Sequence, residues 1–324
     1  MKAIVYTNYG SSNILQLKEL EKPIPKDDEV LLKVHTASVN PLDWHFMRGT
    51  PYVLRIQAGL RKPKNNRLGV DVAGTVESVG KDVTEFKPGD EVFGGCDGAF
   101  AEYVCANEKA FVIKPNNVTF KQAAAVPIAA FTALQGLRDR GQIQPGQKVL
   151  INGAAGGVGT FAIQIAKSFG AIVTGVCSTR NVEMVRSIGA DHVIDYTLED
   201  FTRSDRQYDL IFDAVGNHSL TDCRRVLDSN GILVLVGGPD KGRFLGPLSR
   251  SLRALVLSRF VKQKMVMLFA VRKKADLHII QELLSAGKIT PVIDKCYTLN
   301  DVPEAIRYLE EGHAQGKVVI NVIG

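Results

Sequence analysis

The sequence lacks the features that mark several specialised classes of protein. Its five cysteines form no CxxC or CxxH pair, which argues against a disulfide framework and against a structural zinc lobe. No run approaches the roughly 20 apolar residues of a membrane span, and the first ten residues contain no apolar signal segment. These absences predict a cytoplasmic protein whose cysteines are mostly buried free thiols.

A strong excess of one charge is also missing. Forty Lys and Arg residues against 34 Asp and Glu residues give a formal net charge of +6. This excess suits an anionic ligand such as a phosphorylated nucleotide, but it is too small to predict nucleic-acid binding. The hydrophobic fraction of 45% is typical of folded proteins, and 324 residues are enough for two domains.

What is present falls into two patterns. Up to about residue 118, short β-like runs such as EVLLKVHTASV and VDVAGTVESVG are separated by Gly, Pro, Asn and Asp, which predicts a compact antiparallel β domain. At Thr119 a T-x-x-Q capping box opens a helical stretch that Pro127 should kink or interrupt.

After residue 147 strand-like runs alternate with polar or amphipathic segments, as expected for a parallel sheet with crossover helices. One crossover segment carries an apolar stripe at helical spacing: Val158, Phe161, Ala162, Ile165, Ala166 and Phe169. The last forty residues return to strand-like runs around one helix. We therefore predict one domain over 1–118 with 289–324, and a second domain over 119–288.

The motif Ala154-Ala155-Gly156-Gly157-Val158-Gly159 follows the strand-like run KVLING and opens the striped helix. Placed between a strand and a helix, it matches the fingerprint of a Rossmann dinucleotide site. Small residues let the backbone approach a pyrophosphate, whose charge is met by free N–H groups and by the helix dipole.

The next strand-like run, AIVTGVCSTRN, indicates which dinucleotide binds. Sites for NAD usually end this strand with an acid that accepts the ribose hydroxyls. Here the strand ends in Ser178, Thr179 and Arg180, with no acid before Glu183. A hydroxyl beside a guanidinium suits a 2′-phosphate, so we predict NADPH as the cofactor. The alternative is that Arg180 is a solvated loop charge.

Taken together, these motifs resemble the medium-chain dehydrogenase/reductase family, and within it the zinc-free quinone oxidoreductase and enone reductase branch. The resemblance covers essentially the whole chain. It implies a GroES-like, mostly antiparallel β domain beside a doubly wound Rossmann sheet, hence an α/β fold. Its carriers are ASVNPLDWHFMRG, LGVDVAGTVESVG, FKPGDEVFGG, GAFAEYV, QAAAVPIAAFTAL, NGAAGGVGTFAIQIAK and EGHAQGKVVI.

Zinc enzymes of this family hold their catalytic metal with a Cys, a His-Glu pair and a further Cys or Asp. Here Asn40 occupies the first Cys position and Val70 the His position. Neither side chain can replace a thiolate or an imidazole as a zinc ligand, so no metal site is expected.

Without a metal the substrate must already be electrophilic, which favours a quinone or an α,β-unsaturated carbonyl. The developing enolate oxygen needs prearranged donors, and the candidate catalytic residues are Asn40, Tyr52 and Thr132. Alternatively, Asn40 before Pro41 caps a turn, and Tyr52 is a surface residue. Asp43 is expected to anchor its loop through backbone hydrogen bonds.

The same resemblance implies which residues contact the cofactor along the chain. They are Thr132, Ala155, Gly156, Gly157, Val158, Ser178, Arg180, Tyr196, Val215, His313, Ala314, Gln315 and Lys317.

Two segments, 48–67 and 241–274, combine many cations with apolar residues. They are interpreted either as a weak peripheral membrane surface or as a subunit contact or pocket wall. RNA binding is disfavoured because Tyr52 is the only aromatic residue in the first segment. Two functions compete with the reductase: a low-turnover NADPH-binding protein, and a metal-free carbonyl reductase or alcohol dehydrogenase. A homodimer or a monomer is expected.

Overall fold

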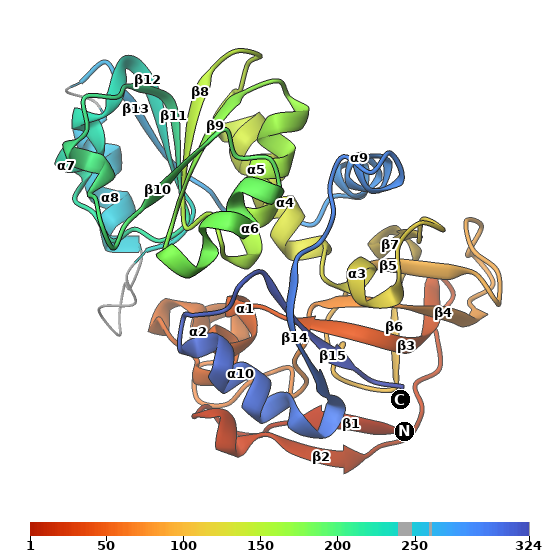
Figure 1. Ribbon diagram of the computed structural model, residues 1–324. Coiled ribbons are helices and arrows are strands. Elements are labelled where there is room, and N and C mark those ends of the chain that lie inside the picture. Colours follow the sequence, from red (N-terminus) through yellow and green to blue (C-terminus); the bar gives the residue numbers. More distant parts are fainter. Residues whose placement is uncertain (239–247, 259–260, 324) are drawn as a thin grey trace. The chain divides into compact units, whose positions relative to one another are not determined.

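The structure, a computed structural model, describes residues 1–238, 248–258 and 261–323, and they form two units (Figure 1). Unit 1 comprises Met1–Ile128, Arg272–Gly287 and Pro291–Gly324. Unit 2 comprises Ala129–Val271 and Lys288–Thr290. The chain thus passes from one unit to the other near residue 128 rather than at 118, and the segment 272–287 joins unit 1 rather than the second domain.

Unit 1 is built on antiparallel strands. Among the described residues its larger sheet has the order β14-β15-β3-β4-β5-β7, with β6 paired to β3, and only β14 and β15 run parallel. The predicted mostly antiparallel, GroES-like domain is confirmed. The strands of this unit are β1 (Lys2–Val5), β2 (Gln16–Glu19), β3 (Glu29–Val39), β4 (Asp71–Val79), β5 (Glu91–Gly95), β6 (Tyr103–Asn107), β7 (Phe111–Ile113), β14 (Ile293–Thr298) and β15 (Lys317–Asn321).

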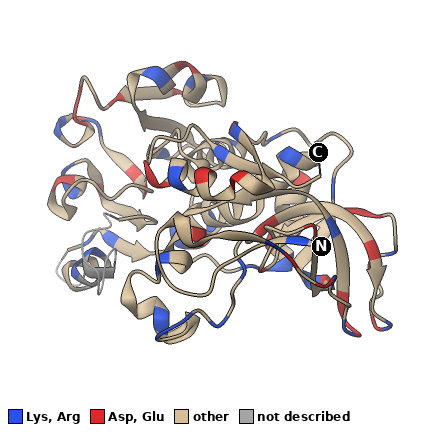
Figure 2. Ribbon diagram, turned by 90° about the horizontal axis from the view of Figure 1, so that it is seen from below, with Lys and Arg blue, Asp and Glu red and all other residues tan. Residues whose placement is uncertain are grey.

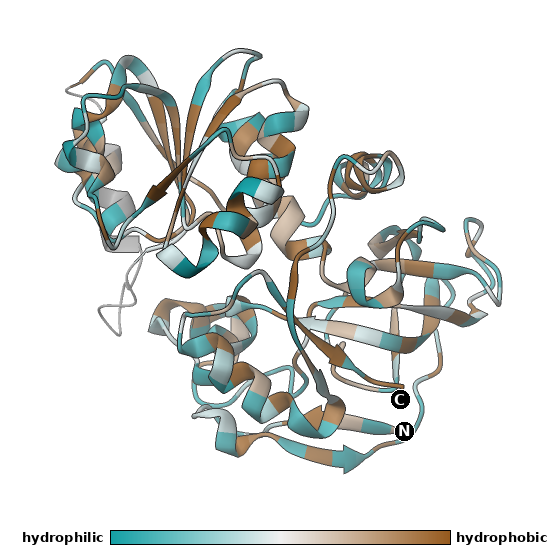
Figure 3. Cartoon of the chain, in the orientation of Figure 1, coloured by the Kyte–Doolittle hydropathy of each residue, from teal (hydrophilic) through white to brown (hydrophobic). Residues whose placement is uncertain are grey.

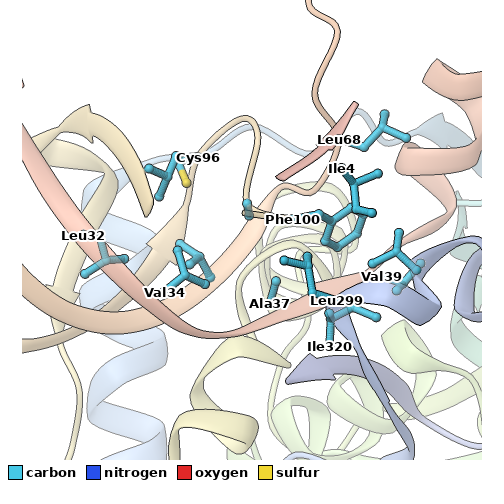
Figure 4. Packing of buried hydrophobic residues seen from close by; sticks show 14 of the residues in the cluster. Ile4, Leu32, Val34, Ala37, Val39, Leu68, Cys96, Phe100, Leu299 and Ile320 are labelled. Atoms are coloured by element: carbon cyan, nitrogen blue, oxygen red, sulfur yellow. The ribbon is translucent and has the colours of Figure 1, made fainter. Parts of the chain in front are cut away.

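The core of unit 1 joins segments from both ends of the chain. Figure 4 shows Ile4, Val39 and Phe100 beside Leu299 and Ile320, which come from the C-terminal segment. All five side chains are buried. Along β3 the alternating residues Val30, Leu32 and Val34 belong to this cluster, and after a register shift between Val34 and Thr36 so do Ala37 and Val39. Helix α10 (Val302–Glu310) adds Val302, Ala305 and Ile306 to the same cluster.

The segment after residue 118 follows its local sequence closely. Gln122 N donates to Thr119 Oγ1 at 3.2 Å and Thr119 N donates to Gln122 Oε1 at 2.9 Å, which is the predicted capping box. Helix α3 (Phe120–Ala124) ends before Pro127, and helix α4 (Pro127–Gln135) begins at it. The predicted interruption is confirmed, because a proline lacks the N–H that a continuous helix would use.

Helix α9 (Lys274–Ser285) accounts for much of the difference in domain boundaries. Asn117 Nδ2 donates to Leu284 O at 2.9 Å, and Gln281 Nε2 donates to Ile113 O at 2.7 Å. These bonds tie α9 to β7 and to the turn that follows it, across more than 160 residues of chain. No local pattern in the sequence encodes such a pairing.

Unit 2 is a parallel sheet. Its described strands have the order β10-β9-β8-β11-β12-β13, and every neighbouring pair is parallel. Counted from β8, this is the order 3-2-1-4-5-6 of the doubly wound Rossmann fold, so this part of the predicted fold is also confirmed. The strands are β8 (Lys148–Asn152), β9 (Ile172–Cys177), β10 (His192–Asp195), β11 (Tyr208–Asp213), β12 (Leu227–Leu235) and β13 (Lys264–Met267). Figure 3 shows these strands as largely hydrophobic, as expected for a sheet covered on both faces.

The helix that follows β8 carries the predicted apolar stripe. In α5 (Gly157–Ser168) the side chains of Phe161, Ala162, Ile165 and Ala166 are all 0% exposed. Burying such a stripe against the sheet is what stabilises a helix of this length. Unit 2 also contains most of α4 and the helices α6 (Val182–Ser187), α7 (Leu220–Arg225) and α8 (Leu248–Leu257).

Charges of both signs are scattered over the described chain (Figure 2). Within the described ranges, no helix combines the length and the apolar character needed to cross a bilayer. The predicted basic segment 241–274 lies partly outside the described residues, at 241–247 and 259–260.

Candidate functional site

The turn between β8 and α5 has the shape that the dinucleotide motif predicts. Gly153 has a φ of +87°, a conformation that favours glycine. A Cβ at Gly153 would lie 2.7 Å from Cγ2 of Val215, so this position also lacks room for a side chain. Val215 follows β11, the strand beside β8, and the structure therefore brings these two predicted site segments together.

Gly159 allows the helix to pack closely on this turn. A Cβ there would lie 2.0 Å from the carbonyl oxygen of Gly153. The first N–H groups of α5, from Gly157 onward, have no partner within the helix. A turn of Gly and Ala residues, followed by a helix N-terminus at the carboxyl end of the sheet, fits a pyrophosphate.

The predicted ribose-phosphate residues lie on two neighbouring strand ends. Tyr196 N donates to Cys177 O at 3.0 Å, which places Tyr196 beside Ser178. Tyr196 is 58% exposed, Arg180 is exposed and Ser178 is half-buried. A phenol, a guanidinium and a hydroxyl thus surround one end of the sheet, a donor set that suits a phosphate.

Two further contacts that sequence reasoning missed fix this loop. Asn181 Nδ2 donates to Ser178 Oγ at 3.1 Å, and Asn181 is buried. Thr179 Oγ1 lies 2.9 Å from Thr197 Oγ1, and Thr197 donates to Asp195 Oδ1. Hydrogen bonds from Thr179 and Thr197 hold the pKa of Asp195 below its usual value. These residue types follow strand ends in the sequence, which is the only signal that could have indicated them.

The point where the strand order of the sheet reverses carries a buried polar group. Asn152 Nδ2, at the end of β8, donates to Asp213 Oδ1, at the end of β11, at 2.9 Å. Arg250 Nη1 lies 2.8 Å from Asp213 Oδ2, although neither atom has hydrogen-bond geometry toward a partner. We therefore regard this contact as an ion pair rather than a hydrogen bond. Arg250 Nη2 donates to His218 O at 3.1 Å.

In unit 1 the residue at the family's first zinc-ligand position belongs to a buried polar cluster. Asn40 Nδ2 donates to Asp71 Oδ2 at 2.8 Å, and Lys317 Nζ donates to Asn40 Oδ1 at 2.5 Å. Ser38 Oγ donates to the same oxygen of Asp71 at 2.9 Å, and Ile128 N donates to Asp71 Oδ1 at 3.0 Å. β3, β4 and β15, which are adjacent strands, supply Ser38, Asp71 and Lys317, and Asn40 directly follows β3.

The cluster holds a balanced pair of charges away from water. Lys317 is 3% exposed and Asp71 is 0% exposed, and Lys317 Nζ lies 3.5 Å from Asp71 Oδ2. Burial lowers the pKa of Lys317, and the neighbouring Asp71 carboxylate opposes that shift. Asn40 bridges the two groups because its amide has both a donor and an acceptor.

Asp43 forms the anchor that the sequence suggested. Its carboxylate accepts from Asn40 N at 2.7 Å and from Gly69 N at 3.0 Å, so it joins the start of helix α1 (Pro41–Arg48) to the segment before β4. Burial raises the pKa of Asp43 to about 7, although both hydrogen bonds oppose the shift.

These contacts bear on whether Asn40 donates to an enolate oxygen or caps a turn. Asn40 Nδ2 donates to Asp71 Oδ2 at 2.8 Å and to Ser38 O at 3.3 Å, so both of its hydrogens are engaged. An enolate oxygen would therefore have to displace an existing acceptor, and a positioning role fits the contacts better. The main chain of Asn40 caps α1, since Asn40 N donates to Asp43 Oδ2 at 2.7 Å and Asn40 O accepts from Asp43 N at 3.0 Å. Val70, at the second zinc-ligand position, is buried, and within the described residues no group of three or more His, Cys, Asp or Glu could hold a metal ion.

The remaining predicted residues divide between the units. Tyr52, in a short 3₁₀ helix of unit 1 (Tyr52–Leu54), has its ring 4.6 Å from the guanidinium of Arg55. Thr132 is half-buried in α4 of unit 2. Near the C-terminus His313 is exposed, and Ala314 packs against the core of unit 1. Gln315 N donates to Asp294 Oδ2 at 2.9 Å.

Comparison with family models assigns most of the chain. Residues 26–116 match the alcohol dehydrogenase GroES-like domain, and residues 188–320 match the model described as zinc-binding dehydrogenase. These ranges fall largely in the first and second predicted domains, respectively.

Relatives with known names agree with these models. The chain is 36% identical over 338 residues to the 2-methylene-furan-3-one reductase of Solanum lycopersicum, which covers 100% of this chain and 79% of the relative. It is 35% identical over 337 residues to the NADPH-dependent alkenal/one oxidoreductase, chloroplastic, of Arabidopsis thaliana, covering 99% and 79%. The solved quinone oxidoreductase from Coxiella burnetii has a TM-score of 0.87 at 30% identity and covers 100% of this chain and 99% of its own.

Proposed function

This chain belongs to the medium-chain dehydrogenase/reductase family, and on that premise we propose that it is a zinc-independent oxidoreductase that uses NADPH to reduce a quinone or an α,β-unsaturated carbonyl. The observation that carries this proposal is the cluster around Asn40. A zinc-ligand position is occupied by an amide whose donors and acceptor are all engaged, and Val70 at the next position cannot bind metal.

The chain's own residues fit the cofactor. The turn at Gly153 and the N-terminus of α5 would hold the pyrophosphate through Ala155, Gly156, Gly157 and Val158, since a Cβ at Gly153 or Gly159 would close that space. Ser178, Arg180 and Tyr196 would hold the 2′-phosphate. We also propose contacts from Thr132, Val215, His313, Ala314 and Gln315. When bound, NADPH supplies a hydride.

Lys317 is also predicted to contact the cofactor. Its predicted contact with the cofactor stays a proposal, because its ammonium is buried in unit 1 on Asn40 Oδ1. We propose that its first task is to orient the Asn40 amide.

The substrate must be electrophilic before it binds, because no Lewis acid polarises it. A conjugated carbonyl accepts a hydride at carbon and develops negative charge on oxygen, where prearranged donors stabilise the transition state. With the Asn40 amide engaged, Tyr52 and Thr132 remain the proposed donors. The names of the relatives, a furanone reductase and an alkenal/one oxidoreductase, support this substrate class.

A substrate and cofactor panel tests the proposal. Purified protein is assayed with enones, quinones and simple aldehydes, each with NADPH and with NADH, in the presence of a chelator. We expect turnover of enones or quinones with NADPH that the chelator leaves unchanged. Turnover confined to simple aldehydes would favour a metal-free carbonyl reductase. NADPH binding without turnover of any substrate would favour a low-turnover binding protein.

The cellular setting remains proposed as well. A cytoplasmic location and a monomer or homodimer are predictions from the sequence. The weak membrane contact is also a prediction from the sequence.

A further inference from the structure

The segment from residue 48 to residue 67, here called the basic loop, carries charge of one sign. It contains six Lys and Arg residues and no Asp or Glu. Three of its cations, Arg61, Lys62 and Lys64, are exposed, and within the described residues no acidic side chain forms an ion pair with them. Such a concentration of exposed cations favours binding of an anionic partner.

Large aliphatic side chains stand beside these cations. Ile56 is 71% exposed and Leu60 is 72% exposed, and Val53 is 37% exposed. Single exposed aliphatic residues are common, but here they lie within eight residues of one another and next to the three cations. The basic loop is therefore amphipathic at its tip.

The tip is held in one conformation. Lys64 N donates to Ala58 O at 2.7 Å, which closes the turn that presents Leu60, and Tyr9 Oη donates to Gly59 O at 2.5 Å. Gly59 has a φ of +120°, and a Cβ there would lie 2.0 Å from the carbonyl oxygen of Lys62. A partner that contacts this tip meets a fixed surface, so little ordering entropy is lost on binding.

The aromatic residues near the loop are already occupied. The Arg55 guanidinium lies 4.5 Å from the centre of the Tyr9 ring and 4.6 Å from that of Tyr52, and Arg55 Nε donates to Gly49 O at 2.8 Å. Because Tyr52 is the only aromatic residue of the loop, single-stranded nucleic acid finds no free ring on which to stack a base.

We propose that the basic loop docks the protein onto an anionic phospholipid surface, with Ile56 and Leu60 among the acyl chains and Arg61, Lys62 and Lys64 at the headgroups. Long cationic side chains suit that boundary, because their stems lie along apolar surface while their charges reach phosphate. A second copy of the loop would bring like charges together. A stable protein–protein interface buries about 800 Å² of surface on each partner. Binding to a bilayer does not need so large a surface.

Vesicle cosedimentation tests the proposal. The full chain is mixed with phosphatidylcholine vesicles with and without phosphatidylglycerol, at low and at high ionic strength. We expect binding to the anionic vesicles at low salt and little binding to phosphatidylcholine alone. Each cation near an anionic surface contributes about fivefold, so the triple variant Arg61→Gln, Lys62→Gln, Lys64→Gln should lose affinity by about a hundredfold. Ile56→Ser with Leu60→Ser should also weaken binding, by about tenfold or more.

A matched control removes the same residue types elsewhere in unit 1. Ile24 is 87% exposed and the Lys26 side chain is 80% exposed, so Ile24→Ser with Lys26→Gln should bind vesicles like the native protein. Equal binding by native protein and both loop variants would overturn the proposal. So would a dimer in sedimentation velocity that the Leu60 change dissolves, or tight binding to single-stranded RNA that the triple variant abolishes.

The docking proposal does not rest on the proposed activity. NADPH oxidation with a water-soluble quinone is measured on the same samples without vesicles, and the loop variants should turn over normally. Loss of vesicle binding with intact turnover, or the reverse, therefore separates the two proposals.

Discussion

Replacing Asn40 by alanine distinguishes a positioning residue from a catalytic donor. The change removes the 2.8 Å bond to the Asp71 carboxylate and the 2.5 Å bond from the Lys317 ammonium. Hydrogen bonds to charged groups are each worth about 1.5–3 kcal/mol. Part of that loss returns if Lys317, now 3.5 Å from Asp71 Oδ2, moves closer to it. We expect Asn40→Ala to lower the free energy of unfolding by about 3–4 kcal/mol.

Thermal unfolding and steady-state kinetics are measured on the same samples. For a unit of this size each kcal/mol corresponds to about 2–4 °C in Tm, so Tm should fall by about 10 °C. At assay temperatures well below the Tm of the variant, kcat should fall by less than about tenfold if Asn40 only positions its neighbours. A single oxyanion donor is worth on the order of 10²-fold or more in kcat. A fall of that size with an unchanged Tm would refute the positioning role.

The variant Asn40→Asp sharpens the test through its pH dependence. It places a second carboxylate against Asp71 Oδ2, where one ammonium must serve both, so one of the two acids should have a raised pKa. A raised pKa in the folded state contributes stability that is lost as pH rises through it. The Tm deficit of Asn40→Asp should therefore shrink on acidification, whereas that of Asn40→Ala should not. A pH-independent deficit for both variants would contradict this charge assignment.

Three further outcomes are expected. Arg180→Ala should weaken NADPH binding by about 1.5–3 kcal/mol and NADH binding much less, measured by calorimetry; equal losses would remove Arg180 from the phosphate site. Because the folded pKa of Asp43 is raised to about 7, its contribution to stability is full below about pH 4 and lost as pH rises through 7. The Tm of native protein relative to Asp43→Asn should fall over that window, and a constant difference would contradict the shift. Since Asn40 and Val70 cannot ligate zinc, elemental analysis should find no stoichiometric zinc, and activity lost in chelator would disprove metal independence.

Much of the fold could be read from local sequence. The run EVLLKVHTASV is β3 along its full length, and the stripe after Gly157 is α5. Capping residues and Pro127 set helix boundaries because their effects act within one turn. These features depend on residues a few positions apart, which is the range over which a sequence pattern is informative.

Features that join distant segments could not be read in this way. Helix α9 joins unit 1 through Asn117 and Gln281, and no periodic pattern announces such bonds. The contact between Lys317 and Asn40 spans 277 residues. The motif around Lys317 predicts a cofactor ligand, which stays a prediction, and it gives no sign of the hydrogen bond from Lys317 Nζ to Asn40 Oδ1. The sequence likewise gives no sign that Asp71, the residue after Val70, is the buried carboxylate of this cluster.

The cluster also gives a physical reason for the absence of a metal ligand set. A carboxylate at Asp71 with 0% exposure needs a compensating positive charge, because burying an unpaired charge is far more costly than burying a paired one. In a zinc site the metal ion meets that need. Here Lys317 supplies the charge and Asn40 couples it to Asp71, so the carboxylate is satisfied by the chain itself. Without such a charge, the two changes at the ligand positions would leave a buried carboxylate unpaired, and Lys317 from β15 forms an ion pair with it. The proposed zinc independence therefore rests on Asp71 and Lys317 as well as on the two ligand positions.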